Sequence, residues 1–312
     1  MSSAIRWFSD LNRTTRTRLL MAGAVVGALL ALAISVVVTS SSPGPAAPQA
    51  DSDGIHMNAA FDAPEGSCLT WDKGNGQDME RIACAQPHLF EVTEILDISQ
   101  DYPPDAPSPD LELWRQISED RCAAGVSDYL SNPLDPHGKF QVGALKPSEA
   151  DWEAGNRDLR CGLWWAGPGG TLQPTSGPVA AQDQSPVWPA GTCLALVGKT
   201  VGDPIDCAEP HSYEMIAVVD VSDEFGKEYP SEKEQHAWLD KTCSKLAEEY
   251  TGGLDLDKKK LILAWDTRQE ESWDAGSYLV NCKVGAKLAD GSGLAPVTGS
   301  IKEAPTTKRD GG

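Results

Sequence analysis

The pattern of apolar and polar positions divides the chain into an apolar run and a patterned body. Residues 19–38 form a run of 20 residues without a charge. Between residues 64 and 287, short apolar stretches lie between turn residues. Two longer stretches carry apolar residues three or four positions apart. Short apolar or alternating runs are typical of strands, and the longer spacing is typical of one helix face. The pattern predicts one apolar helix followed by a body of mixed α and β structure.

The body is expected to contain the same series of elements twice. Helices are predicted over residues 110–130 and 231–250, and Ser231 with Glu234 forms a capping box at the start of the second. One helix per unit cannot cover a parallel sheet, so the predicted class is α+β. The expected strands are residues 68–71, 81–85, 92–98, 140–145 and 160–165, and then 193–197, 205–209, 215–221, 260–265 and 278–284.

Nine landmark residues recur in order, at an offset that drifts only from 125 to 121. An internal similarity of this kind indicates a duplicated domain. The pairs are Cys68 and Cys193, Cys84 and Cys207, His88 and His211, Glu91 and Glu214, Cys122 and Cys243, Tyr129 and Tyr250, Trp152 and Trp273, Gly155 and Gly276, and Cys161 and Cys282.

Composition predicts the boundaries of the remaining segments. Segments rich in Ser, Pro, Ala, Gly and Gln, without periodic apolar positions, are typical of tethers and linkers. The predicted organisation is a basic N-terminus (1–18), a transmembrane helix (19–39), a flexible tether (40–63), a first repeat (64–166), a linker (167–188), a second repeat (189–287) and a disordered tail (288–312).

Charge predicts the topology and excludes one class of partner. The formal net charge is -20, yet residues 1–18 carry four arginines and one acid. Basic residues before an apolar run of this length predict a single-pass anchor in the cell membrane, with a cytoplasmic N-terminus and an extracytoplasmic body. A cleaved signal peptide is the alternative, but its apolar region is usually only about 7–15 residues. The strongly acidic body argues against nucleic-acid binding.

All eight cysteines follow the apolar run, four in each repeat. An even number of cysteines outside the cytoplasm is typical of a disulfide framework, and four cysteines allow three pairings. The first two of each repeat lie on neighbouring extended segments, and the last two lie on the helix face and the final strand. The pairs predicted on this basis are Cys68–Cys84, Cys122–Cys161, Cys193–Cys207 and Cys243–Cys282.

The repeated landmarks resemble the septum formation-related domain of bacterial membrane proteins. The pattern is G-[ST]-C-L, then C-x-x-P-H-x-x-E, a helical cysteine, W-x-x-G and a last cysteine, over about residues 64–166 and 189–285. The repeats differ after W-x-x-G, where Arg157 in the first stands against Tyr278 in the second. The resemblance implies a connection with division septa and implies no defined reaction.

The H-x-x-E pairs, His88 with Glu91 and His211 with Glu214, allow several interpretations. On a helix, each pair would share a face and could bind one metal ion. In a strand, positions i and i+3 point to opposite faces, so each pair would supply only one ligand to a site. We expect structural histidines that donate to a backbone carbonyl beside the disulfide. Ligand or partner contact, and metal binding or catalysis, remain the alternatives. No metal or cofactor is predicted.

Other catalytic patterns are missing from the sequence. The closest cysteines are 14 residues apart, so no C-x-x-C redox pair exists. Neither S-x-x-K nor G-x-S-x-G occurs, which argues against a wall-active serine enzyme. The acids Asp255 and Asp257 are too few for a calcium loop. The sequence therefore predicts a protein that is not an enzyme.

The ten tryptophans are the remaining lead. Most, including Trp152 and Trp273, are expected in the core. Trp165 and Trp188, near the linker, are candidates for stacking on a glycan or anchoring a partner. The predicted function is a non-enzymatic, membrane-anchored envelope protein that binds a protein of the division or cell-wall machinery. The alternative is a general glycan- or ion-binding module without a septal role.

Overall fold

The computed structural model describes residues 63–302, except residues 75 and 77. The described residues all belong to one compact unit. The predicted cytoplasmic segment and transmembrane helix, and nearly all of the tether, lie outside the described residues. Within the described part of the chain, no helix is long and apolar enough to cross a membrane.

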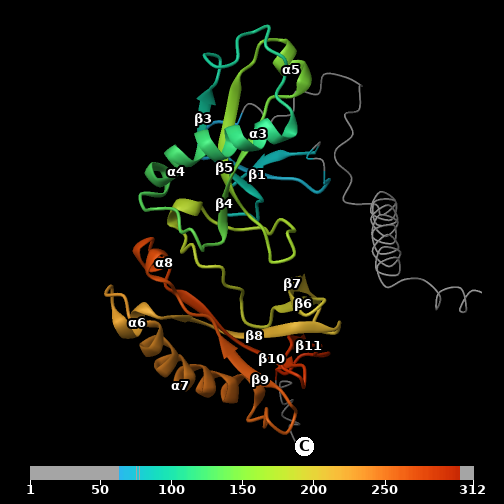
Figure 1. The fold of residues 1–312 in the computed structure, drawn as a ribbon, viewed down its shortest axis with the longest axis vertical. Helices are drawn as coiled ribbons and strands as arrows, with labels where there is room; N and C mark the ends of the chain where they lie inside the picture. The colour runs from blue at the N-terminus through green and yellow to red at the C-terminus, as the bar shows by residue number, and fades with distance from the viewer. Residues whose placement is uncertain (1–62, 75, 77, 303–312) are drawn as a thin grey trace, which may run out of the picture. The chain divides into compact units, whose positions relative to one another are not determined.

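The N-terminal half is built on a five-stranded antiparallel sheet with the strand order β2-β1-β3-β5-β4 (Figure 1). Helical residues buried on one face of the sheet, Trp114 and Ile117, pack with Leu159 of β5. The elements are β1 (Cys68–Thr70), β2 (Glu80–Ile82), β3 (Phe90–Asp97), α3 (Leu111–Ile117), α4 (Ala123–Leu130), β4 (Phe140–Leu145), α5 (Glu149–Glu153) and β5 (Asp158–Trp165).

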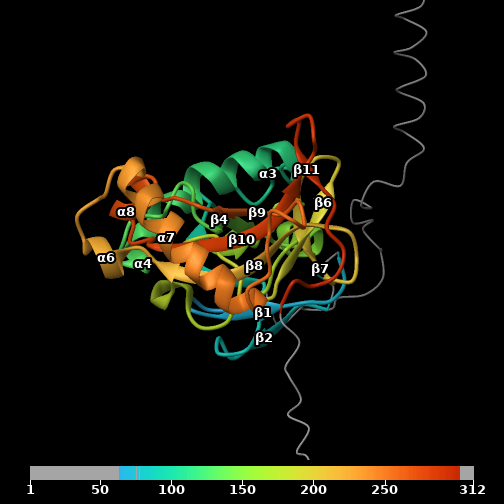
Figure 2. The same cartoon turned by 90° about the horizontal axis from the view of Figure 1, so that it is seen from below.

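The C-terminal half contains a sheet with the order β11-β10-β8-β6-β7, and β9 also pairs with β10. Figure 2 shows β6 and β7 side by side at one edge of this sheet. The elements are β6 (Cys193–Val197), β7 (Thr200–Ile205), β8 (His211–Asp220), α6 (Ser222–Phe225), α7 (Glu232–Thr251), β9 (Ile262–Trp265), α8 (Glu270–Asp274), β10 (Leu279–Lys287) and β11 (Leu294–Ala295).

Corresponding strands occupy corresponding places in the two sheets. In each half, the strand that carries the first cysteine lies between its hairpin partner and the long strand. The long strand then pairs with the last strand, which carries the fourth cysteine. The α+β class is therefore as predicted. Duplication as the origin of the two halves stays a prediction.

The two main helices differ in their middle turns. Helix α7 begins at the predicted capping box of Ser231 and Glu234 and ends before Gly252, whose φ is 67°. The helix of the N-terminal half is interrupted by a π-helical turn over Ser118–Cys122. Its buried residues Ile117 and Cys122 are five positions apart, and a turn with i to i+5 bonds accommodates that spacing on one face.

A hydrophobic core joins the two halves. One cluster contains Leu130, Phe140 and Trp165 of the N-terminal half together with Trp188, Leu194 and Met215. Trp165 and Trp188 are each only 9% exposed, and their ring centroids lie 4.4 Å apart. Long-range packing between the halves, which no local pattern encodes, covers most of both rings and places them in the core. A binding role for their exposed edges stays a prediction.

Candidate functional site

Each half carries two disulfides. The structure contains the four predicted pairs, with Cα–Cα distances of 5.2 to 5.5 Å. Cys122–Cys161 and Cys243–Cys282 join the helix to the sheet. Cys68–Cys84 and Cys193–Cys207 join the first strand to the turn after its hairpin partner, so the extended segments predicted over 81–85 and 205–209 end before their cysteines. A disulfide that closes a loop of this size stabilises a domain by about 2–4 kcal/mol.

The first candidate site surrounds Glu91, which is fully buried. The Tyr129 hydroxyl donates to Glu91 Oε1 at 2.6 Å. The Val179 backbone N–H donates to Glu91 Oε2 at 3.0 Å. The sulfur of Cys68 lies 3.3 Å from the same oxygen and carries no hydrogen, because it is in a disulfide. The carboxylate therefore links a helix, a strand and the segment after β5.

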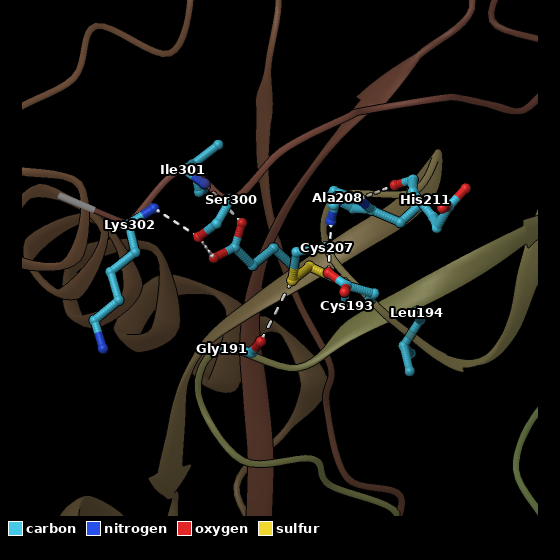
Figure 3. Close-up of a disulfide and its surroundings, with 12 residues drawn as sticks. Gly191, Cys193, Leu194, Cys207, Ala208, His211, Ser300, Ile301 and Lys302 are labelled. Atoms are coloured by element: carbon cyan, nitrogen blue, oxygen red, sulfur yellow. Dashed lines mark hydrogen bonds between the residues drawn. A yellow bond between two sulfur atoms is a disulfide. The ribbon is translucent and has the colours of Figure 1, made fainter. Parts of the chain in front are cut away.

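The second candidate site repeats this arrangement around Glu214. Its Oε1 accepts hydrogen bonds from the Tyr250 hydroxyl at 2.7 Å and the Ser300 hydroxyl at 2.6 Å. The Ile301 backbone N–H donates to Oε2 at 2.8 Å. Figure 3 shows Ser300 and Ile301 on the segment that passes beside the Cys193–Cys207 disulfide.

The segments that reach the two glutamates also correspond to each other. We call residues 172–179 the first strap and residues 294–301 the second strap. Each contains Leu-x-Pro-x-x-Gly followed by x and an aliphatic residue. Thr175 pairs with His88, and Val297 pairs with His211, as isolated β-bridges. The strap glycines Gly177 and Gly299 donate to the carbonyls of the second cysteines, Cys84 and Cys207.

The straps extend each half beyond its predicted boundary. The segment predicted as a linker (167–188) holds the first strap, and the segment predicted as a disordered tail (288–312) holds the second. The straps are Pro- and Gly-rich, and they bind to their sheets through backbone bonds at both histidines and both glutamates. The internal repeat of Leu-x-Pro-x-x-Gly was the signal that could have identified them.

The two histidines have the same tautomer. His88 Nδ1 lies 3.0 Å from the Gln86 carbonyl oxygen, and His211 Nδ1 lies 2.9 Å from the Glu209 carbonyl oxygen. A carbonyl oxygen only accepts, so each Nδ1 carries a proton. Both side chains are fully buried, and neither Nε2 has a hydrogen-bond partner among the described residues. The expected bond to a backbone carbonyl is present in both halves.

The prediction that His and Glu of each pair point to opposite faces is wrong. His88 Nε2 lies 3.5 Å from Glu91 Oε2. In the C-terminal half, the β6–β8 pairing shifts register between Tyr213 and His211, so the strand carries a bulge. A bulge adds one residue to the strand and shifts the alternation of its side chains by one position. The histidine and the glutamate three positions later then point to the same face of the sheet.

Nearby sulfur, nitrogen and oxygen atoms resemble a ligand set for a metal ion. Atoms of Cys193, His211 and Glu214 lie within 4.8 Å of one another. Zinc binds cysteine as the thiolate, and these sulfurs are in a disulfide. Each half then offers one imidazole nitrogen and one carboxylate that already accepts hydrogen bonds. The geometry fits a buried structural network better than a metal centre.

The network shifts the ionisation of its members. Burial raises the pKa of Tyr129 and of Tyr250, and the hydrogen bond to the adjacent carboxylate raises it further. Burial alone would lower the pKa of His88, but the Glu91 carboxylate and the Gln86 carbonyl favour the imidazolium. The net effect raises the pKa of His88 above its ordinary value.

We expect a His88→Gln substitution to remove a pH-dependent part of the stability. A histidine with a raised pKa in the folded state stabilises fully below its unfolded pKa, and this contribution is lost as pH rises through the folded pKa. The difference in unfolding free energy between the wild type and His88→Gln should be largest below the ordinary value of 6.5 and shrink above it. Urea unfolding over a pH series measures it. A constant difference would contradict the His88–Glu91 pair.

The W-x-x-G motifs are structural in both halves. Trp152 Nε1 donates to Ala106 O, and Trp273 Nε1 donates to Lys227 O, both at 2.8 Å. The motif glycines have φ values of 91° and 82°, which only glycine adopts at low cost. Arg157 lies over the Trp152 ring, with its guanidinium carbon 3.7 Å from the ring centroid.

The residue that differs between the halves after this motif has the same packing partner in both. Arg157 donates to carbonyls of the preceding loop, including Tyr102 O and Pro103 O. Tyr278, at the corresponding position, packs edge-on against Trp273, with ring centroids 4.8 Å apart. A cation thus covers the motif tryptophan in the N-terminal half, and a tyrosine covers the corresponding tryptophan in the C-terminal half.

Comparison with known proteins identifies one family. The family model described as "Septum formation" matches residues 65–282 as a single span across both halves. The chain is also 35% identical, over 320 residues, to uncharacterized membrane proteins from two strains of Mycobacterium tuberculosis. The matches cover 96% of this chain and 70% of each relative. No solved structure matches the chain.

Proposed function

Since this chain belongs to the septum formation family, we propose that it is a membrane-anchored, non-enzymatic protein that acts at the division septum by binding a partner. The observation that carries the proposal is the family match over residues 65–282, which includes the first sheet and most of the second. The relatives from Mycobacterium tuberculosis are named as membrane proteins, and this supports a membrane location for the chain.

The proposed topology has a single-pass anchor at residues 19–39. The basic residues 1–18 would lie in the cytoplasm and the folded body outside it. Four disulfides suit a body that folds on the oxidising side of the membrane.

The buried networks support a binding role over a catalytic one. His88 and His211, the residues most suited to acid–base chemistry, are fully buried, and each donates to a backbone carbonyl. Glu91 and Glu214 accept several hydrogen bonds from the fold. These groups stabilise the straps, the sheets and the helices, so the partner is expected to contact the outer surface.

Fluorescence localisation in growing cells tests the proposal. A full chain with an oxidation-tolerant fluorescent tag at its C-terminus is compared with a tagged fragment of residues 1–60. We expect enrichment at midcell for the full chain and a uniform membrane signal for the fragment. That result would assign the targeting to the folded body.

Three outcomes would contradict the proposal in different ways. A uniform signal from both fusions would remove the septal role and favour the general envelope-binding alternative. Midcell enrichment of both fusions would assign the targeting to the N-terminal 60 residues. A soluble full chain would contradict the anchor.

A further inference from the structure

A pocket of about 420 Å³ lies at the junction of the two halves. A volume of this size is in the range of small-molecule sites, about 300–1,000 Å³. Both halves contribute to its walls, and these include Trp165 of β5 and Trp188 of the segment before β6. The charged residues that line it are Lys139, Asp266, Arg268 and Lys283.

The charge of this pocket is opposite to the charge of the chain. Three cations and one carboxylate line it, whereas the whole chain carries a formal charge of -20. Lys283 is paired with Asp266, so the single carboxylate is already bound. Lys139 and Arg268 therefore leave the pocket with positive charge that no lining residue neutralises.

Arg268 is a buried guanidinium without a close anion. It is only 7% exposed, and its Nε has no hydrogen-bond partner. Among the described residues, no carboxylate oxygen lies within 4.0 Å of its side-chain nitrogens. An unpaired buried charge destabilises a protein by several kcal/mol, and a bound anion would offset part of that.

The nearest acids contact other groups, although Asp135 Oδ2 has no hydrogen-bond partner among the described residues. Asp183 accepts from the backbone N–H groups of Ser185 and Tyr278. Asp135 accepts from the Ser272 hydroxyl and lies outside the pocket lining. Burial lowers the pKa of Arg268, and the carboxylates of Asp266, Asp135 and Asp183 offset this only in part from longer range.

Lys139 supplies the second free cation beside an aromatic wall. Its Nζ lies 5.0 Å from the centroid of the Phe140 ring and 5.6 Å from that of Trp165. The indoles of Trp165 and Trp188 line the same pocket. An apolar wall next to a pair of cations suits a ligand with a ring at one end and an anion at the other.

We propose that this pocket binds a small molecule that carries a carboxylate on a sugar or apolar ring. Arg268 and Lys139 bind the carboxylate, and the two indoles pack against the ring. A guanidinium matches the planar geometry of a carboxylate with two parallel hydrogen bonds. The inference goes beyond the proposed septal role and does not depend on it, since it concerns only the pocket.

Isothermal titration calorimetry on the full chain in detergent tests the site with three probes. N-acetylmuramic acid has a sugar ring with a carboxylate, N-acetylglucosamine has the related ring without one, and inorganic phosphate has the anion alone. We expect the carboxylate sugar to bind at least about 10-fold more tightly than the neutral sugar or phosphate, because only it uses both parts of the pocket.

Substitutions identify the residues. Arg268→Gln and Lys139→Gln should each weaken binding of the carboxylate sugar by about 10-fold or more. Lys245→Gln, on the exposed face of α7 and outside the pocket, is the matched control and should leave binding unchanged. Thermal melting checks that each variant is folded. If Arg268→Gln does not fold, Lys139→Gln decides the test.

Four results would overturn the proposal. They are no binding of the carboxylate sugar, equal binding of the neutral sugar, tighter binding of phosphate, and unchanged binding in the Lys139→Gln variant. The localisation experiment measures where the protein lies in the cell, not whether this pocket binds a ligand. A negative binding result therefore leaves the septal proposal intact.

Discussion

A Trp165→Ala variant is expected to unfold with a free energy about 3–5 kcal/mol lower than that of the wild type. The ring is 9% exposed and packs at 4.4 Å on Trp188, in the cluster that joins the halves. Its removal leaves a cavity that rigid neighbouring strands cannot fill. Urea unfolding monitored by circular dichroism measures the change.

The same variant also tests whether the halves fold as one unit. The wild type should unfold in a single transition, because one core and several hydrogen bonds cross the junction. Loss of the Trp165 ring weakens that junction, so two transitions are expected to separate. Leu111→Ala is the control, because Leu111 is 74% exposed, and it should change stability by less than about 0.5 kcal/mol. A cost below about 1 kcal/mol for Trp165→Ala would contradict a shared core.

Local pattern was enough to predict the two main helices, most of the strands and the disulfides. It missed α5, α6, α8 and β11, and it placed a strand over 205–209 where the structure has β7 at Thr200–Ile205. The helix from Ser231 was predictable because the capping box and the apolar spacing agree, and α7 covers that range. Cys122–Cys161 and Cys243–Cys282 were predictable because the landmark order placed one cysteine on a helix face and its partner on a later strand, and the other two pairs because their cysteines lie close together in the sequence. In these cases the information lies within a few residues of the element.

The features that sequence reasoning missed depend on contacts between distant residues. Burial of Trp165 against Trp188 requires the two halves to pack, and no local periodicity reports that. The shared face of His211 and Glu214 results from a register shift against β6, which belongs to the pairing of two strands. Tyr129 and Tyr250 were visible as repeated landmarks, but their bonds to the glutamates follow only from helix packing.

The straps show a different kind of miss. Their Pro- and Gly-rich composition is typical of linkers, and they contain no periodic apolar positions. Their order comes from the sites they cover, since Val179 and Ile301 donate to buried carboxylates. Without the strap, each carboxylate would lose a backbone donor. The opposite also holds, because without the buried carboxylate each strap would lose a strong acceptor.

The histidines, glutamates and straps therefore form one structural device in each half. The histidine pairs with the strap through its backbone and with the turn before it through its ring. The glutamate three positions later binds the strap and the helix tyrosine. In each half, a histidine and a glutamate of the kind found in active sites hold the strap against the sheet.

A chain that ends at Lys287 is expected to be less stable than a chain that ends at Lys302 by about 3 kcal/mol or more. The shorter chain lacks the second strap, so Glu214 loses the Ser300 and Ile301 donors and keeps Tyr250. The longer chain keeps every strap contact and is the matched control. Urea unfolding of both purified chains measures the difference.

A point variant separates the hydrogen bonds from the rest of the strap. Ser300→Ala removes one donor to a buried carboxylate and should lower the unfolding free energy by about 1.5–3 kcal/mol. Thr298→Ala, two residues earlier in the strap and without a bond to Glu214, should have a smaller effect. Equal stability of the chains ending at Lys287 and Lys302 would return residues 288–302 to the disordered tail that composition predicts. If the unfolding free energy falls only in the shorter chain and in Ser300→Ala, the second strap is part of the folded domain. Only a bound segment can stabilise the site that it covers.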